Sequence, residues 1–242
     1  MNPSGLLIVD KPLDLTSMTV CRAVKRKLVA AGFPKKIKVG HGGTLDPLAT
    51  GVVVVLVGTA TKLCDRVMAG RKRYVAEVDL SRVSTTDDRE GELTEVAVER
   101  RPTRTEVEAA AAGFVGTIQQ RPPSHSAIWV EGRRSYHLAR AGKAEDLPER
   151  PVDVHSIAVV GYEWPRVKLE VECGKGTYIR SLARDLGKSL SCGGMLHSLR
   201  RTAVGRFTVE RAVPLDDLPE RIGQAELLDP ERLDWGDGTG AA

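Results

Sequence analysis

The segment Gly40-His41-Gly42-Gly43-Thr44-Leu45-Asp46-Pro47-Leu48-Ala49-Thr50-Gly51 runs directly into the apolar stretch Val52-Val53-Val54-Val55-Leu56-Val57. The apolar stretch is short and rich in β-branched residues, which predicts a strand buried on both of its faces. The glycine-rich segment is then a loop attached to a rigid strand, a common position for reactive groups. Pro47 disfavours helical backbone at Asp46, so this carboxylate is expected in an extended or turn conformation. On local chemistry alone, an ordinary turn in which Asp46 bonds to its own backbone is an equal alternative.

The segment from His41 to Gly51 resembles the H-x-G-T-L-D-P-x-A-T-G motif of the TruB-type tRNA pseudouridine synthases. In that family the aspartate before the proline is the single essential aspartate, which implies a catalytic role for Asp46. The resemblance covers about residues 5–212. It includes K-x-Y-x-A at residues 72–76, T-x-D-x-x-G at 86–91, Q-x-P-P at 120–123, G-T-Y-I-R-S at 176–181 and L-R-R-T at 199–202.

The resemblance implies two further catalytic residues. Tyr74 would stack on the target base, whereas on the residues alone it reads as a sheet residue with its hydroxyl at the surface. Arg180 lies in the first turn of a predicted helix, where a positive charge is unfavourable for the helix dipole, so a carboxylate partner is expected. The family pairs this arginine with the catalytic aspartate, which implies an Arg180–Asp46 pair.

A second set of residues is predicted to bind the substrate. His41 would occupy the space left by the extruded base, although a lone histidine is more often structural. Leu199 would contact the flipped base, and Asp88 would be a second carboxylate beside the site. The complete predicted substrate-binding set is His41, Asp88, Leu199, Lys11, Lys62 and Arg200.

The charge distribution indicates a polyanionic partner. The 242 residues carry a formal charge of +4, and residues 213–242 hold eight acidic residues against two arginines. That segment has a net charge of −6, which leaves +10 on residues 1–212. Basic clusters are often only a solvated face, but five of them before residue 202 favour a nucleic-acid partner.

Metal, disulfide and membrane chemistry find no support in the sequence. The four cysteines and five histidines are scattered and form neither a C-x-x-C pair nor a zinc pattern. The N-terminal apolar run is only four residues long, too short for a signal peptide or a membrane span. The sequence therefore predicts a cytoplasmic protein that needs no cofactor and no metal and that has no membrane partner.

The order of the expected elements favours an α+β fold over alternating α/β. Strands are expected over residues 6–9, 71–80, 152–164 and 167–173, and helices over about 16–31, 59–68, 104–114 and up to 190. The family resemblance implies a mixed, mostly antiparallel central sheet flanked by helices. It also implies a catalytic domain over residues 1–212, with a thumb-like RNA-clamping insertion at 121–151. Residues 213–242 are expected to be a short acidic segment without a full C-terminal RNA-binding domain.

Four positions depart from the family pattern. Asp14 stands where glycine is usual, His125 where tyrosine is usual and Trp129 where lysine is usual. Gly42 fills the variable position of the His41 motif. The sequence does not predict whether these departures alter the choice of substrate.

The resemblance implies isomerisation of uridine to pseudouridine at position 55 in the T loop of tRNA. The base would be flipped out, its glycosidic bond broken and C5 joined to the ribose, with Asp46 as nucleophile or base. The expected partner is the T arm of tRNA, bound by a monomer without an obligate protein partner. The alternatives are a tRNA-binding or folding module of the same fold, a guide-RNA-dependent synthase and a glycosidase with Asp88 as second acid.

Overall fold

The computed structural model describes residues 2–124, 126, 129–130, 133–134, 147–233 and 235. These residues form two compact units. The first contains the chain up to residue 74 and from residue 200 onward, and the second contains residues 75–199. The predicted division into residues 1–212 and 213–242 stays a prediction. Much of the predicted insertion at 121–151, including His125, lies outside the described residues.

The described elements are runs of consecutive strands separated by helices. The helices are α1 (Ser17–Ala30), α2 (Cys64–Ala69), α3 (Arg104–Ala112) and α5 (Ile179–Ser189), with 3-10 helices η1 (Gly58–Leu63), η2 (Val209–Arg211), η3 (Leu215–Asp217) and η4 (Pro230–Arg232). The strands are β1 (Gly5–Lys11), β2 (Val39–His41), β3 (Ala49–Val57), β4 (Lys72–Asp79), β5 (Arg82–Ser84), β6 (Leu93–Glu95), β7 (Gly116–Gln120), β8 (Trp129–Val130), β9 (Arg133–Arg134), β10 (Arg150–Glu163), β11 (Arg166–Cys173), β12 (Met195–Val204), β13 (Phe207–Thr208) and β14 (Val213–Pro214). Their pairing is mixed and mostly antiparallel, which confirms the predicted α+β class.

The sheet of the first unit is built around β3. Its strand order is β14-β1-β3, and β2 also pairs with β3. β1 and β3 are antiparallel and in register from Gly5 opposite Val57 to Lys11 opposite Gly51. Residues 52–57 are at most 1% exposed, which confirms the prediction of a strand buried on both faces.

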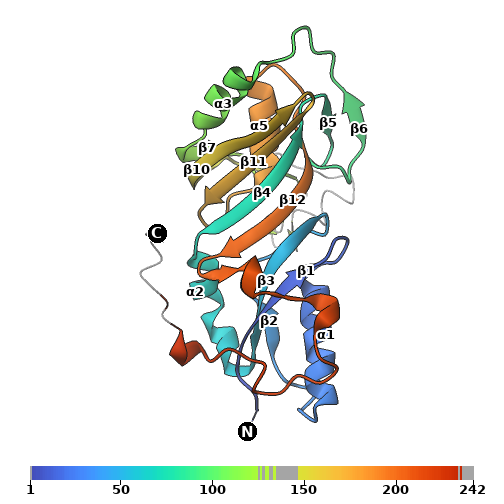
Figure 1. Ribbon diagram of the computed structural model, residues 1–242, viewed down its shortest axis with the longest axis vertical. Helices are drawn as coiled ribbons and strands as arrows, with labels where there is room; N and C mark the ends of the chain where they lie inside the picture. The colour runs from blue at the N-terminus through green and yellow to red at the C-terminus, as the bar shows by residue number, and fades with distance from the viewer. Residues whose placement is uncertain are drawn as a thin grey trace. The chain divides into compact units, whose positions relative to one another are not determined.

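Helix α1 packs on β2 and β3 within the first unit (Figure 1). The helix begins after Thr16, whose side chain accepts a hydrogen bond from the backbone N–H of Thr19 and so caps the first turn. Val20, Val24 and Leu28 are fully buried at a spacing of four residues, which places them on one helix face. This face removes apolar surface from water and orients the helix on the sheet.

The C-terminal segment completes the first unit. β14 pairs in parallel with β1, and Leu228 exchanges two backbone hydrogen bonds with Leu6, of 2.8 and 2.9 Å. Leu233 and Trp235 pack against the buried cluster that contains Leu6, Val54 and Phe207. The segment is therefore not only acidic: its apolar side chains pack on the first unit, which its charge alone does not indicate.

The second unit has the strand order β4-β11-β10-β7 (Figure 1). Helix α3 packs against β10 and α5. Its start is a capping box, in which Thr103 and Glu106 satisfy each other's backbone N–H groups. No described helix of the chain is both long enough and apolar enough to span a bilayer.

Truncation of one buried side chain in the C-terminal segment tests its structural role. Ile222 is 0% exposed, so Ile222→Ala leaves a cavity and is expected to lower the free energy of unfolding by about 3 kcal/mol. Leu228→Ala is the matched control, because Leu228 is 40% exposed and should cost less than about 1 kcal/mol. Urea unfolding followed by circular dichroism measures both, and equal effects would show that the segment does not pack as described.

Candidate active site

The loop that carries Asp46 connects β2 to β3 in the first unit. Asp46 is half-buried, and its carbonyl accepts a 3.1 Å hydrogen bond from the N–H of Ala49. The neighbouring Leu45 is tied to α1 on both sides of its backbone. Its N–H donates to Oγ of Ser17 at 2.8 Å, and that hydroxyl donates to the carbonyl of Leu45 at 3.0 Å. A rigid helix therefore fixes the residue directly before the carboxylate.

The carbonyl of Pro47 fixes the residue directly after the carboxylate. It accepts a 2.9 Å hydrogen bond from the N–H of Asp14 and a 3.3 Å bond from Nζ of Lys11. The sequence predicts Lys11 as an RNA contact, whereas in the structure this side chain is 0% exposed and also donates to the carbonyl of Pro12. The buried ammonium of Lys11 is therefore hydrogen-bonded to backbone carbonyls, which offset part of the cost of burying its charge.

The turn at Asp14 adopts a conformation that usually requires glycine. Its φ is 63°, in the left-handed region. Aspartate is one of the few residues other than glycine that enter this region at modest cost. The replacement of the family's glycine therefore preserves the turn, and with it the hydrogen bond to Pro47.

His41 ends β2 with its imidazole half-buried. Nδ1 is buried and has no hydrogen-bond partner among the described residues. Burial lowers the pKa of His41 below its usual 6.5, and the positive charge of Arg201 lowers it further. Both effects favour the neutral imidazole at pH 7.

Gly42 lies where α2 crosses the loop. A Cβ at this position would overlap Cγ1 of Val67. The N–H of Gly42 donates to the carbonyl of Val54 at 2.8 Å, so the loop cannot easily move away. Close approach of Val67 therefore explains the glycine at this position of the motif.

The remaining predicted residues of the first unit occupy different environments. Tyr74 is half-buried on β4, and Lys62 is exposed on η1. Arg200 on β12 pairs with Asp10, with 2.6 Å between Nη2 and Oδ2, and donates to Oγ1 of Thr50 at 3.2 Å. The next residue, Arg201, was not predicted, yet its guanidinium is buried against carbonyls of the Asp46 loop.

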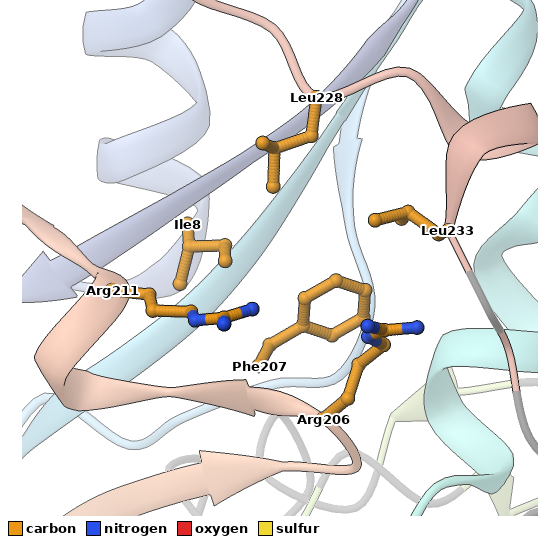
Figure 2. Close-up of a pocket in the computed structure, with 6 residues that line it drawn as sticks. All are labelled: Ile8, Arg206, Phe207, Arg211, Leu228 and Leu233. Atoms are coloured by element: carbon orange, nitrogen blue, oxygen red, sulfur yellow. The ribbon is translucent and has the colours of Figure 1, made fainter.

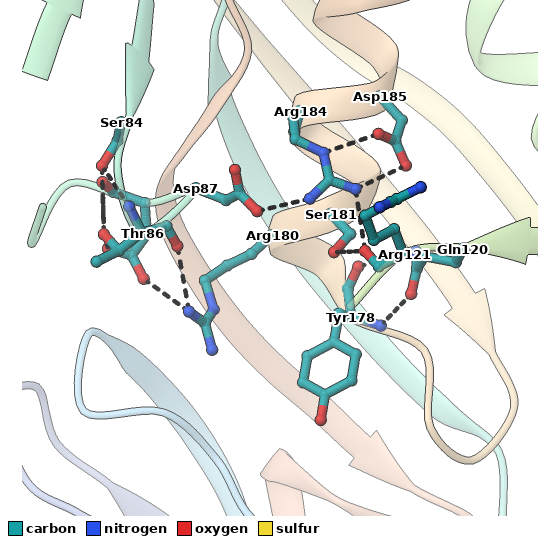
Figure 3. Close-up of polar contacts among 11 residues, drawn as sticks. Ser84, Thr86, Asp87, Gln120, Arg121, Tyr178, Arg180, Ser181, Arg184 and Asp185 are labelled. Carbon is teal, nitrogen blue, oxygen red and sulfur yellow. Dashed lines mark hydrogen bonds and ion pairs between the residues drawn. The ribbon is translucent and has the colours of Figure 1, made fainter. Parts of the chain in front are cut away.

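Arg180 and Asp88 lie together in the second unit. They are 5% and 2% exposed, and 3.4 Å separates Nη1 of Arg180 from Oδ2 of Asp88. Nη1 also donates to the carbonyl of Thr86 at 3.2 Å (Figure 3). The other oxygen of Asp88 accepts hydrogen bonds from Oγ1 of Thr86 at 2.5 Å and from the N–H of Glu90 at 2.9 Å. A carboxylate therefore lies beside this first-turn arginine, and it is that of Asp88.

The start of α5 is held by the end of β7 (Figure 3). The buried amide of Gln120 accepts from the N–H of Tyr178 at 2.8 Å and donates to the carbonyl of Tyr178 at 3.1 Å. The carbonyl of Arg121 accepts from Oγ of Ser181 at 2.8 Å and from Nη2 of Arg184 at 3.0 Å. These contacts fix the backbone on both sides of Arg180.

Leu199, on β12, is buried, with 8% of its surface exposed. The predicted pair of Arg180 with Asp46 joins residues of different units and stays a prediction. The same holds for the predicted roles of Tyr74 and Leu199 at a shared base.

The first unit also contains a cavity of about 430 Å³. Figure 2 shows its apolar lining with the guanidinium groups of two arginines at its border. The lining residues are Ile8, Arg206, Phe207, Arg211, Leu228 and Leu233. None of the predicted site residues belongs to this set.

Two family models match the chain. Residues 26–179 match the model described as "TruB family pseudouridylate synthase (N terminal domain)". Residues 180–234 match the model described as "tRNA pseudouridylate synthase B C-terminal domain". Together the two matches extend over both units.

Curated relatives are similar over most of the chain. A tRNA pseudouridine synthase B of Caulobacter sp. (strain K31) is 45% identical over 225 residues, which are 93% of this chain and 70% of the relative. One of Sinorhizobium medicae (strain WSM419) is 44% identical over 240 residues, which are 97% of this chain and 75% of the relative.

Two solved structures of complexes contain a chain with a similar fold. A Cbf5-Nop10-Gar1 complex contains a chain that is 30% identical, with a TM-score of 0.67 over 88% of this chain. An archaeal box H/ACA sRNP Nop10-Cbf5 complex contains one that is 27% identical, with a TM-score of 0.63. This chain spans about half the length of those chains, 53% and 52%.

Substitution of Asp14 tests the left-handed turn beside Pro47. Asp14→Ala is expected to lower the free energy of unfolding by about 1 kcal/mol, because alanine pays more than aspartate to adopt positive φ. Asp14→Gly should stay within about 0.5 kcal/mol of wild type or stabilise slightly. Thermal and urea unfolding measure the pair, and an alanine variant as stable as the glycine variant would contradict the turn.

A double-mutant cycle tests the contact between Gly42 and Val67. Gly42→Ala alone should destabilise by about 1–3 kcal/mol through overpacking. In the Val67→Ala background the same change should cost at least about 0.5 kcal/mol less, because the clashing methyl is absent. Additive effects in urea unfolding would mean that Val67 does not limit the loop.

Proposed function

We propose, on the premise that this chain belongs to the TruB family of pseudouridylate synthases, that it converts uridine to pseudouridine in tRNA. The substrate uridine is the one at position 55 in the T loop. The observation that carries the proposal is the family motif placed on a loop that α1, Lys11 and Asp14 hold on both sides of Asp46. A half-buried carboxylate on such a loop suits precise attack on a sugar.

The reaction is a redox-neutral isomerisation. The bond between N1 of uracil and C1′ of ribose breaks, and a bond between C5 and C1′ forms. C5 loses a proton and N1 gains one, so no oxidant, metal or nucleotide enters the balance. The target base must leave the stacked loop first, because its glycosidic carbon is otherwise unreachable.

Each predicted residue has a defined part in this proposal. Asp46 acts on the sugar as nucleophile or base, and Arg180 pairs with it. Asp88 supports Arg180 from the second unit, since their charged groups are 3.4 Å apart. Tyr74 stacks on the flipped base, a contact worth about 1–3 kcal/mol.

The groups around the base complete the proposed site. Leu199 supplies an apolar contact, and the neutral His41 occupies the space that the base leaves. Lys62 and Arg200 contact phosphates, and recognition rests on the folded shape of the T arm. We further propose a cytoplasmic monomer that needs no partner protein.

A guide-RNA-dependent synthase is the second candidate, since two similar solved chains come from complexes with Nop10. Sequence identity favours the tRNA synthase that needs no guide RNA. This chain is 45% identical to a tRNA pseudouridine synthase B and 30% identical to the chain of the Cbf5-Nop10-Gar1 complex. A non-catalytic tRNA-binding module would share the basic surface, so only activity separates it from the enzyme.

The pseudouridine content of an unmodified tRNA transcript tests the proposal. Purified protein is incubated with the transcript in the presence of EDTA and no nucleotide. We expect conversion at position 55 by wild type, and a loss of about 10³-fold or more with Asp46→Asn, because the amide can neither attack nor accept a proton.

Two controls make the result specific. Asp216→Asn removes an exposed carboxylate of the C-terminal segment and should convert the transcript as wild type does. A transcript with cytidine at position 55 should gain no pseudouridine. If wild type binds the tRNA tightly but does not convert it, the proposed synthase activity is contradicted and the non-catalytic tRNA-binding module remains.

A further inference from the structure

Arg201 is a charged residue buried in the first unit. It lies on β12 and is 2% exposed. Each of its three guanidinium nitrogens donates to a different backbone carbonyl. Nε donates to Val52 at 2.8 Å, Nη1 to Thr44 at 3.0 Å and Nη2 to Gly43 at 3.2 Å.

These three carbonyls bracket the Asp46 loop. Gly43 and Thr44 precede the carboxylate by three and two positions, and Val52 follows it inside β3. One planar group therefore joins the incoming and outgoing arms of the loop. A guanidinium suits this task because its donors are held in a fixed fork, whereas an ammonium presents all its donors from one atom.

The glycines of the loop fit around Arg201. Gly51 has a φ of 107°, and a Cβ there would overlap the carbonyl oxygen of Arg201. Gly43 has a φ of 122°, and a Cβ there would lie 3.9 Å from Nη1. Gly43 and Gly51 thus adopt, beside β12, positive φ angles that would be strained in a residue with a side chain.

Packing alone does not account for an arginine at this position. Its guanidinium pairs with no carboxylate among the described residues, so only carbonyl dipoles offset the buried charge. An apolar side chain of similar volume would fill the space without that desolvation cost. What the arginine adds is the fixed geometry of three hydrogen bonds.

We propose that Arg201 is a positioning residue, whose guanidinium sets the distance between the two arms of the loop and thereby aims the carboxylate of Asp46. This inference rests on the proposed function. Arg201 does not touch the substrate; it acts through the backbone on either side of Asp46. Arg200, one residue earlier, faces the opposite side of the strand and pairs with Asp10.

Arg201→Lys and Arg201→Gln test the inference by single-turnover kinetics with enzyme in excess over tRNA. Both variants lose the fork, so the rate constant of conversion should fall about 10- to 100-fold, as expected for a small misplacement of a catalytic group. The dissociation constant for tRNA should change less than about 3-fold. Arg221→Lys, at an exposed arginine of the C-terminal segment, should leave both quantities as in wild type.

The single-turnover rate constant separates positioning from stability, because partial unfolding lowers the fraction of active enzyme and not the rate constant at saturation. Either variant that stays folded at 15 °C and keeps a rate constant within about 2-fold of wild type would overturn the proposal. Unfolding of both variants would also overturn it, because Arg201 would then be needed for the fold of the unit.

The titration of His41 gives a readout without activity. The charge of Arg201 lowers the pKa of His41, so Arg201→Gln should raise that pKa and Arg201→Lys should raise it less. Proton NMR of the imidazole measures both shifts. If wild type is inactive but the variants show these pKa shifts, the proposed function is rejected and the place of Arg201 beside the loop is kept. If the pKa of His41 is unchanged in Arg201→Gln, the place of Arg201 beside the loop is rejected.

Discussion

Burial of β3 on both faces is the constraint on which the first unit depends. A strand whose residues 52–57 are all at most 1% exposed needs a cover on each side. Helix α1 supplies one cover, and α2, Phe207 and the C-terminal segment supply apolar side chains to the cluster around Val52, Val54 and Leu56. Segments more than 150 residues apart in the sequence must therefore meet before the strand is stable, and the loop that precedes it inherits their rigidity.

The rigidity of this loop comes from groups that are costly to bury. Lys11 and Arg201 are both almost inaccessible, and each gives its donors to carbonyls of residues 43–52 or of the turn at Pro12. A loop has few backbone hydrogen bonds of its own, so its carbonyls need partners once it is buried. The side-chain cations supply those partners, and their hydrogen bonds to the carbonyls offset part of the desolvation cost.

Local chemistry was predictable from the sequence, since its causes lie within a few residues. The cap at Thr103, the β-branched core of β3 and the apolar face of α1 are of this kind. A carboxylate neighbour of Arg180 was also predictable in kind, because a positive charge in a first turn is unfavourable for the helix dipole and a carboxylate offsets it. Its identification as Asp88 was not, because it depends on where the turn after β5 meets α5.

The residues that sequence reasoning missed are those whose role contradicts their type. Lys11 was predicted to bind the substrate and Arg201 was not selected at all, whereas both side chains are buried, although a charged residue on a strand is usually exposed. One signal was available: Arg200 and Arg201 are adjacent on a strand, and side chains of adjacent strand residues point to opposite faces. One of the two arginines must therefore point into the first unit wherever one face of the strand is covered. In such a strand the buried arginine needs several acceptors at once, and a glycine-rich loop with free carbonyls is the segment best able to provide them.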